Sequence, residues 1–424
     1  MFGRKKRSEV LVVGAGPVGL ITALLLDREG VDVQIIDQAW RAAGRSYAAA
    51  LHPSTLALLD DLGIAKAVLA EAHRVDAVAF YDGKHRHAKV DFGKLPGRYP
   101  CVVVLPQSTL ESMLEERLRQ RGRTVQWLHR LSGFQQETDR VVAEVEVLES
   151  VSGGYAVAMQ GTQVSHALDV ECSFLVGADG HHSFVRRALG VEYESWGQVE
   201  TYDVFEFESD DDAAGEARIA IDETTTNVLW TLPNGRQRWS FQVVGVDSPD
   251  RERVKSRLMM AVPGESSPRF TGELLHKMMR ERAPWFRRKV GDIAWAGEVS
   301  FEPRLAKRLG QRRVWLVGDA VHQTGPIGVQ SMNAGLLEAR KLVAAMREAL
   351  RTGAVEEGLT SYQDVCVPAW CRMLGIQELF TAEGGSAGDW VARRLDRIVP
   401  CLPASGEDLV LLGRQLGCRV VGAD

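Results

Sequence analysis

A glycine-rich turn between an apolar strand and a helix, close to the start of the chain, most constrains the fold. Residues 14–19 read Gly-Ala-Gly-Pro-Val-Gly, after the apolar run 10–13 and before a helical pattern. In this context the first glycine allows a tight turn, the second lets a ligand approach the backbone, and the third lets the helix pack against the strand. Gly14, Gly16 and Gly19 therefore predict a nucleotide-binding fold.

An acidic residue ends the strand that follows this helix. The second strand is predicted over residues 31–36, and Asp37 comes directly after it. Its carboxylate suits both hydroxyls of a ribose and disfavours a ribose 2′-phosphate. The free N–H groups and positive dipole end of the helix that begins at Pro17 suit a pyrophosphate. The predicted ligand is therefore FAD or NAD.

The basic N-terminal residues 4–7, followed by the uncharged run 10–26, superficially look like an export signal. Glycines and a proline interrupt the run and no small-residue cleavage site follows, so we interpret the basic residues as a solvated tail. No other apolar run reaches about 18 residues. Six cysteines without a CxxC pair fit a reducing compartment. We expect a cytoplasmic protein without a membrane span.

The charge balance argues against a polyanionic partner. The 424 residues include 51 lysines and arginines and 56 aspartates and glutamates, a net charge of −5, which gives no broad positive field for nucleic acid. His85 and His87 share one strand face, but no nearby cysteine or carboxylate pattern completes a metal site. We predict no nucleic-acid partner and no metal.

Two further glycine–acid clusters follow buried strands. Residues 177–180 read Gly-Ala-Asp-Gly, with Arg186 in the short helix that follows, and a second cluster begins at Gly318 and continues to residue 333. In both, a carboxylate (Asp179 or Asp319) lies just beyond the C-terminal end of a strand, where open α/β sheets place their ligands. We expect both carboxylates beside the nucleotide.

With these three motifs in this order and spacing, the chain resembles the FAD-dependent aromatic hydroxylases of the para-hydroxybenzoate hydroxylase fold, the single-component flavin monooxygenases. The motifs frame about residues 8–350. The resemblance implies that Asp319 binds the ribityl hydroxyls of FAD, and that Arg45 and Gln107 contact its ribose and phosphate. It also implies that the second motif serves both FAD and the nicotinamide cofactor, with His182 as a candidate contact. The predicted cofactor-binding residues are Gly14, Gly16, Gly19, Asp37, Arg45, Gln107, Asp179, His182, Arg186, Gly318, Asp319, Val329 and Asn333.

The implied chemistry is flavin reduction by NAD(P)H, reaction with dioxygen to a flavin hydroperoxide, and oxygen transfer to an electron-rich ring. Pro326 and Gly328 resemble the family's turn beside the oxygen-reacting edge, and we predict them as catalytic because they bring neither bulk nor a proton donor. A helix beginning near Ser331 would stabilise negative charge on the reduced flavin. Many members have a Gly-Gln-Gly run where this chain has Val-Gln-Ser over residues 329–331, so we expect a shift of the flavin or its covering loop.

The substrate is predicted to lie between the flavin ring and a second sheet. Residues 198–245 form the most β-rich block of the chain, and Tyr202, Trp230 and Phe241 are the selected substrate contacts. Core packing is the alternative for each, because an alternating strand buries one face regardless of function. Tyr202 or His52 would suit as a base that deprotonates a phenol, and the sequence fixes neither.

We predict an α/β chain with a Rossmann-like FAD-binding domain built on a parallel sheet, interleaved with a mainly antiparallel substrate domain and followed by C-terminal helices. The predicted FAD-binding domain covers residues 1–75, 100–190 and 285–358, the substrate domain 76–99 and 191–284, and the C-terminal helical region 359–424.

The predicted function is NAD(P)H- and dioxygen-dependent hydroxylation of a phenolic or polyketide-like small molecule. The alternatives are a flavin halogenase, oxidase or reductase on the same scaffold, or a flavin-binding protein that sequesters a small molecule without turnover. Halogenases of this scaffold carry Trp-x-Trp-x-Ile-Pro, whereas residues 283–286 here read Ala-Pro-Trp-Phe, which argues against that branch.

Overall fold

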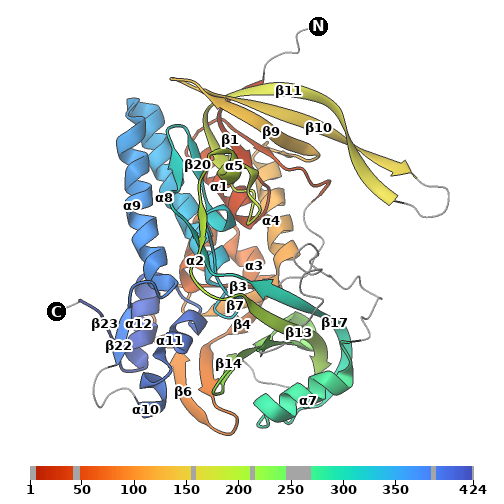
Figure 1. The fold of residues 1–424 in the computed structure, drawn as a ribbon, viewed down its shortest axis with the longest axis vertical. Helices are drawn as coiled ribbons and strands as arrows, with labels where there is room; N and C mark the ends of the chain where they lie inside the picture. Colours follow the sequence, from red (N-terminus) through yellow and green to blue (C-terminus); the bar gives the residue numbers. More distant parts are fainter. Residues whose placement is uncertain are drawn as a thin grey trace.

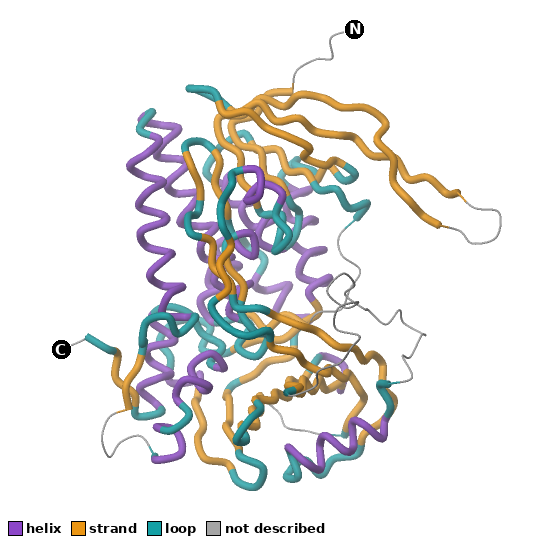
Figure 2. The backbone as a smooth tube through the Cα atoms, in the orientation of Figure 1, coloured by secondary structure: helices purple, strands orange, loops and turns teal. Residues whose placement is uncertain are grey.

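The computed structural model describes six stretches of the chain. They are residues 6–41, 48–153, 159–210, 215–244, 269–382 and 388–422. Two features of the sequence lie outside the described residues. One is Arg45, which was predicted to contact FAD, and the other is a helical pattern over residues 249–260. Figure 2 shows the strands of the described stretches in two main groups, at the top and the bottom of the view.

The larger sheet has eight strands in the described part of the chain, and its central pairs are parallel. β1 (Lys6–Val13) pairs with β2 (Val33–Ile36) and with β11 (Met159–Gly177), and β11 pairs with β20 (Val314–Leu316). Strands buried on both faces read as continuous apolar runs, which explains the apolar residues 10–13. The other strands of this sheet are β8 (Val125–Gln126), β9 (His129–Gln136), β10 (Val141–Gly153) and β19 (Gly310–Gln311).

The helices of this part of the molecule share one apolar core with the sheet. α1 (Pro17–Arg28) contacts both α4 (Gln107–Gln120) and α8 (Gln330–Thr352), and α9 (Val355–Met373) packs along α8 (Figure 1). Pro17 occupies the first turn of α1, where its missing N–H costs no hydrogen bond. The shorter helices of this part are α2 (Pro53–Asp61), α3 (Ala65–Glu71) and α5 (Phe184–Ala188).

The sequence pattern over residues 125–176 predicts short β runs separated by turns, whereas the structure has the longer strands β9, β10 and β11 there. β10 spans 13 residues and β11 spans 19, and the two pair antiparallel along their length. They extend away from the rest of the molecule at the upper right of Figure 1. Only the last part of β11 lies in the parallel sheet, which is where its apolar residues 174–176 are found.

The second sheet has seven strands among the described residues, and all its pairs except β14 with β5 are antiparallel. Helix α7 (Gly272–Arg282) packs on one of its faces. Together the two sheets confirm the predicted α/β architecture. In spatial order the strands are β17 (Val290–Phe301), β13 (Glu200–Ser209), β16 (Arg236–Val243), β15 (Thr226–Thr231), β14 (Glu216–Ile221), β5 (Ala77–Tyr81) and β6 (Arg86–Asp91).

The predicted return to the FAD-binding domain at residue 285 comes too early. β17 (Val290–Phe301) is an edge strand of the second sheet and pairs with β13. An isolated strand carries no sequence signal for which sheet it joins, which explains the error. The chain returns to the larger unit through β18 (Arg304–Ala306), which pairs with β12 (Tyr193–Ser195) and β21 (His322–Gln323).

A small antiparallel sheet lies where the two main sheets meet (Figure 1). β7 (Val102–Pro106) pairs with β3 (Ala48–Leu51) on one side and β4 (His73–Val75) on the other. One buried cluster contains residues of this sheet, such as Val104, together with residues of the second sheet, such as Trp230. This shared core fixes the two parts of the molecule against each other.

The C-terminal region mixes helices with strands, whereas the sequence predicted helices alone. The sequence has a helical pattern over residues 359–380, whereas the helix found there, α9, begins earlier, at Val355, and ends at Met373. The cluster that contains Tyr202 and Ile327 also contains Ile398, Cys401 and Leu402, so this region closes the junction between the sheets. Its elements are β22 (Phe380–Ala382), α10 (Asp389–Ala392), α11 (Leu395–Ile398), α12 (Glu407–Gln415) and β23 (Cys418–Val420).

Candidate functional site

The three glycine–acid turns come together at one edge of the larger sheet. Val13 at the end of β1 is in register with Gly177 at the end of β11, and Gly177 with Leu316 at the end of β20. The turns are also tied by backbone hydrogen bonds, from the N–H of Ala178 to the carbonyl of Val13 (2.8 Å) and from the N–H of Val317 to that of Gly177 (3.0 Å). Parallel strands deliver their carboxyl ends to the same edge, so the turns face one region.

The glycines of the first turn differ in what surrounds them. Gly14 has φ +105°, and a Cβ there would lie 2.3 Å from the carbonyl oxygen of Ala178. A Cβ at Gly19 would lie 1.9 Å from the carbonyl oxygen of Gly14. A Cβ at Gly16, in contrast, would meet no atom within 4 Å. Gly14 and Gly19 are therefore required by the protein itself, whereas the space beside Gly16 suits a bound pyrophosphate.

The third turn lies directly against the first helix. Gly318 has φ +66°, and a Cβ there would lie 3.0 Å from a methyl group of Val18. A Cβ at Gly335, on the second turn of α8, would lie 2.9 Å from the Cα of Gly318. The absence of these side chains brings α8, α1 and the third turn into close contact. Asp319 is thereby fixed beside the first turn.

The predicted carboxylates keep unused hydrogen-bonding capacity. Asp37 accepts one bond per oxygen, from the N–H groups of Ala15 (2.7 Å) and Ala39 (2.8 Å), and each carboxylate oxygen can accept a second. Oδ2 of Asp179 accepts from the N–H of Val185 (3.1 Å), while Oδ1 is buried and no described residue donates to it. A buried acceptor of this kind is costly unless a ligand satisfies it.

Burial raises the pKa values of Asp179 and Asp319. For Asp179, hydrogen bonds from Ser183 and Val185 act in the opposite direction. For Asp319, the opposing influences are the nearby His322 and a hydrogen bond with Ser331. The ionised form of a buried carboxylate is stabilised most by hydrogen bonds from hydroxyl or N–H donors. A ribityl chain or a ribose would supply such hydroxyl groups.

Arg186, predicted as a cofactor contact, has another role. Its guanidinium donates to the carbonyls of Ala320 (2.9 Å) and His181 (2.8 Å), and its Cζ lies 3.9 Å from the centre of the Tyr193 ring. Only 5% of the residue is exposed. Arg186 therefore ties the second turn to the third as a positioning residue.

Asn333 was also predicted as a cofactor contact, and its side chain is instead fully used within the protein. Its Oδ1 accepts from the N–H of His52 (2.9 Å) and the hydroxyl of Thr55 (2.8 Å). Its Nδ2 donates to the carbonyls of Ala50 and Val329, both at 2.8 Å. An amide has no more than these four bonds to make in such a site, so Asn333 anchors the start of α8 to the start of α2.

The other predicted contacts occupy different environments. Gln107 begins α4 and donates to Glu111 (2.8 Å), which leaves its own carbonyl oxygen available to a ligand. His182 is exposed on the loop after β11, with its ring centre 4.0 Å from that of His181. The cofactor contacts of Gln107 and His182 therefore stay predictions. Neither side chain takes part in the buried hydrogen bonds made by Arg186 and Asn333.

The turn before α8 has a strained backbone. Val329 caps the helix with φ +49°, in the left-handed region that β-branched residues avoid. A Cβ at Gly328 would lie 2.3 Å from the carbonyl oxygen of Pro400, so the C-terminal region holds the turn in place. Strain of this kind persists only where the surroundings fix it, and it is common at ligand-binding sites.

His52 is fully buried behind this turn. Its Nε2 lies 2.9 Å from the carbonyl oxygen of Gly328 and donates to it, which leaves Nδ1 to accept from the hydroxyl of Ser405 (3.3 Å). Burial lowers the pKa of His52 to about 4, so the ring is neutral at pH 7. With both ring nitrogens occupied, His52 supports the turn and does not suit the role of a base.

Tyr202 does not suit the role of a base either, but its hydrogen-bonding partner Glu200 does. Burial, and then the charge of Glu200, raise the pKa of Tyr202 well above its ordinary value, so the phenol stays protonated and donates to Glu200 (2.9 Å). Burial raises the pKa of Glu200, and a Cβ at Gly325 would lie 2.4 Å from its Oε2. Glu200 thus touches the turn that contains Pro326. Sequence reasoning missed it, although its place two residues before Tyr202 on one strand face was a usable signal.

The predicted substrate contacts lie on opposite faces of the second sheet. Tyr202 and Trp230 belong to the cluster that contains Ile327 of the turn before α8. Phe241 lies on the other face, stacked on Trp239 with ring centres 4.9 Å apart, in the cluster under α7. The prediction for Phe241 was therefore wrong, because alternation alone does not say which face of a strand meets the ligand.

Two buried polar clusters had no clear sequence signal. On the face of Tyr202, Arg238 and Glu206 form an ion pair, with the Nε of Arg238 2.8 Å from Glu206 Oε1. Beside Asp319, the Nε2 of fully buried His322 lies 2.6 Å from Oε2 of Glu338. The His322 ring also stacks on Trp370 at 3.7 Å between ring centres. Residues 16 positions apart meet here only because the third turn folds back on α8.

Comparison with known proteins identifies the family. The FAD binding domain family matches residues 7–374. The chain belongs to this family. The open space beside Gly16 and the unsatisfied Oδ1 of Asp179 fit the FAD that such a domain holds.

Two curated relatives are similar in sequence to most of this chain. It is 28% identical to a 6-methylpretetramide 4-monooxygenase of Streptomyces rimosus, over 88% of this chain and 62% of the relative. It is 29% identical to a flavin-dependent monooxygenase of Mycobacteroides abscessus, over 87% of this chain and 73% of the relative. The chain thus spans less than two thirds of the length of the first of these.

A solved structure supports the same fold. The p-nitrophenol 4-monooxygenase of Pseudomonas putida superposes with a TM-score of 0.68 at 22% identity, covering 98% of this chain and 100% of that one. At this identity the likeness concerns the fold. Within the described residues, no helix combines the length and apolar character needed to cross a membrane, and no cluster of three or more His, Cys, Asp or Glu side chains offers a metal site.

Proposed function

We propose that this protein is an FAD-dependent monooxygenase that uses NAD(P)H and dioxygen to hydroxylate a phenolic or polyketide-like aromatic molecule. The observation that carries the proposal is the meeting of the three glycine–acid turns at one sheet edge in a member of the FAD binding domain family. Two of the three proteins described above are named as monooxygenases of a particular substrate, 6-methylpretetramide in one case and p-nitrophenol in the other, which supports this substrate class.

Bound FAD would supply hydride uptake and oxygen transfer, chemistry that protein side chains lack. The residues that would hold it are those of the first turn around Gly16, with Asp37 for the ribose and Asp319 for the ribityl chain. Gln107 remains a proposed contact to the phosphate or ribose, and His182 a proposed contact to the nicotinamide cofactor. None of these assignments needs the side chain of Arg186 or Asn333, which are occupied by the protein.

The turn before α8 would lie along the flavin ring. The helix N-terminus that follows Val329 presents free N–H groups and a positive dipole end, which favour negative charge on a reduced ring. Neutral His52 holds the carbonyl of Gly328 and so fixes the direction of this turn. Pro326 and Gly328 add no proton donor at the edge where oxygen reacts.

Glu200 and Tyr202 would handle the substrate proton. A phenol becomes a stronger nucleophile when it loses its proton, and a carboxylate with a raised pKa is a suitable acceptor near neutral pH. Tyr202 stays protonated and donates its hydrogen bond to Glu200. We therefore assign Glu200 the role of proton acceptor and Tyr202 that of its hydrogen-bonding partner.

Absorbance spectroscopy and a substrate screen test this function. The purified protein, reconstituted with FAD where needed, should show a flavin spectrum. It should consume NADH or NADPH faster in the presence of one or more phenols or polyketide phenols, with a product heavier by one oxygen atom. Flavin binding without any stimulation by such compounds would favour the sequestration alternative. Chlorinated product in the presence of chloride would favour a halogenase.

A further inference from the structure

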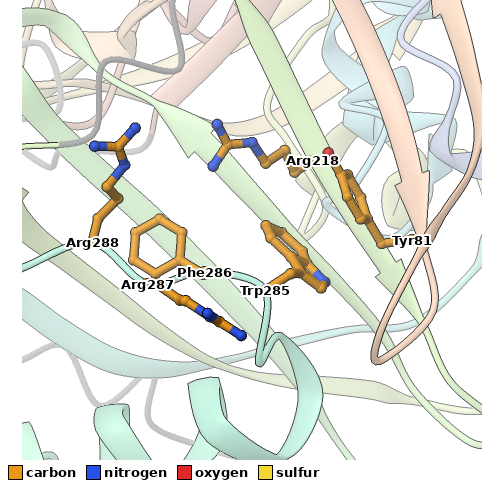
Figure 3. A pocket seen from close by; sticks show the side chains of 6 residues that line it. All are labelled: Tyr81, Arg218, Trp285, Phe286, Arg287 and Arg288. Atoms are coloured by element: carbon orange, nitrogen blue, oxygen red, sulfur yellow. The ribbon is translucent and has the colours of Figure 1, made fainter.

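A second hollow lies on the face of the second sheet that is turned away from the candidate flavin site. Its volume is about 400 Å3. Phe286, one of its walls, belongs to the cluster under α7, whereas Trp230 and Ile327 belong to the cluster on the opposite face. The hollow is therefore separate from the site described above. It is lined by Tyr81, Arg218, Trp285, Phe286, Arg287 and Arg288 (Figure 3).

Aromatic rings from separate parts of the chain form one wall. Tyr81, the last residue of β5, stacks on Trp285, which follows α7, with ring centres 4.2 Å apart and planes at 22°. Phe286 meets Trp285 edge to face at 6.5 Å. Such a wall offers stacking surface to a planar ligand. The Nε1 of Trp285 is buried, and no described residue accepts its hydrogen bond.

Arginines form the rest of the lining. Three of the six lining residues are arginines and none is acidic, although Arg218 also pairs with Glu216 from outside the lining, with Nε 3.5 Å from Oε1. Arg218 projects from β14 with its Cζ 5.8 Å from the Trp285 ring centre, and Figure 3 shows it on the same side of the pocket as Tyr81. Arg287 and Arg288 are exposed. Guanidinium groups match carboxylate and phosphate geometry and also stack on rings.

We propose that this pocket binds an aromatic ring that carries an anionic oxygen group. Its volume lies at the lower end of the range for small-molecule sites, which suits one or two fused rings with a carboxylate or phosphate. The shared chemistry has two possible sources, an aromatic carboxylate or the adenosine phosphate part of a nucleotide. The proposal does not depend on the proposed monooxygenase activity, because the pocket lies on the other face of the sheet.

Calorimetric titration of the FAD-loaded protein tests the ligand chemistry. The probes are 1-naphthoate for the carboxylate source and adenosine 2′,5′-bisphosphate for the nucleotide source. 2-Naphthalenemethanol provides a ring without charge, and inorganic phosphate a charge without a ring. One of the first two probes should bind with a Kd of about 1 mM or tighter, and the two controls should bind at least about tenfold more weakly. The probe that binds identifies the source.

Variants locate the binding. Arg287→Gln combined with Arg288→Gln changes two exposed side chains and should weaken binding about tenfold. Arg280→Gln, an exposed arginine on α7 that does not line the pocket, is the matched control and should change the Kd by less than about twofold. Trp285→Leu removes the stacking surface and should weaken the binding of both 1-naphthoate and adenosine 2′,5′-bisphosphate.

Failure takes two clear forms. If neither 1-naphthoate nor adenosine 2′,5′-bisphosphate binds to the wild-type protein, the proposal is wrong. If a probe binds with the same Kd to the double arginine variant and to Trp285→Leu, it occupies another site, and the proposal is again wrong. Neither result bears on phenol-stimulated NAD(P)H consumption, so the monooxygenase proposal is tested separately.

Discussion

The turns at the edge of the larger sheet and the face of the second sheet use different means to form a binding site. At the turns, the backbone shapes the binding site. Gly14 and Gly19 leave no room for a side chain, while Gly16 leaves space for a ligand. On the second sheet, side chains shape the binding site through hydrogen-bonded pairs such as Glu200 with Tyr202 and Glu206 with Arg238. A glycine pattern is visible in a sequence, whereas a pairing between strands is visible only once they fold.

The largest effect is expected at the open glycine. Gly16→Val should leave the fold intact, because a Cβ there meets no protein atom within 4 Å, but its side chain would fill the space for the pyrophosphate. We expect FAD affinity of the apoprotein to fall by about a thousandfold, the scale of losing several hydrogen bonds to a charged group. Quenching of flavin fluorescence during titration measures this.

Gly83→Val provides the matched control. Its Cβ also meets no atom within 4 Å, but the residue lies in the hairpin turn between β5 and β6. It should bind FAD like the wild-type protein. Equal affinity of the two variants would mean that the turn at Gly16 does not hold the cofactor.

The next largest effect is expected on the second sheet. Glu200→Gln removes the proposed proton acceptor and should lower kcat about a hundredfold, the lower end of the range for acid–base catalysis. Because burial raises the pKa of Glu200, wild-type activity should fall as the pH drops through that raised pKa and the carboxylate gains a proton. The variant should lack this acid limb. A kcat–pH profile with an unchanged acid limb in Glu200→Gln would assign the proton to another group.

An intermediate effect is expected at the junction between the two regions. His52 has a pKa of about 4 in the folded protein and about 6.5 when unfolded. The unfolded chain therefore binds a proton first, so the stability that depends on neutral His52 is complete above pH 6.5 and is lost as the pH falls toward 4. This corresponds to a loss of about 2 kcal/mol between pH 7 and pH 5.

Urea unfolding at several pH values measures the contribution of His52. His52→Gln should show a smaller loss of stability over the same interval, whereas His85→Gln, which changes an exposed histidine, should behave like the wild-type protein. An identical pH dependence in His52→Gln and the wild type would contradict a buried neutral imidazole.

The smallest effect is expected at the strained turn. Val329 holds a left-handed backbone with φ +49°, which costs about 1–2 kcal/mol for a residue with a Cβ. Val329→Gly relieves this strain and should raise the free energy of unfolding by about 1 kcal/mol. Val329→Ala keeps a Cβ and should not be stabilised. If both variants lose stability equally, side-chain packing outweighs backbone strain at this position.

Much of the fold could be predicted because its signals are local. The first strand, turn and helix follow from apolar runs and glycine spacing, and the hairpin of β5 and β6 follows from alternation around an Asp-Gly turn. The placement of β17 could not be predicted, since its pairing with β13 is a contact between distant segments. The length of β10 and β11 was missed for a similar reason, because each strand is stabilised mainly by the other.

The candidate site, like the fold, could be predicted where its signals are local and could not where they depend on contacts between distant residues. Gly14, Gly16 and Gly19 lie as their spacing indicated, but Arg186 and Asn333 bond to the protein, a use of polar groups that depends on three-dimensional neighbours. Phe241 was misplaced because a strand pattern separates two faces without saying which one meets a ligand. Glu200 was within reach of sequence reasoning, as it shares a strand face with Tyr202.

The ratio of FAD to protein after reconstitution tests the central claim most directly. If the turns at residues 14–19, 177–180 and 318–319 jointly hold one dinucleotide, then apoprotein mixed with excess FAD and passed through a desalting column should retain one flavin per chain, measured by absorbance against protein concentration. A chain that remains colourless under these conditions, although correctly folded by circular dichroism, would contradict the account.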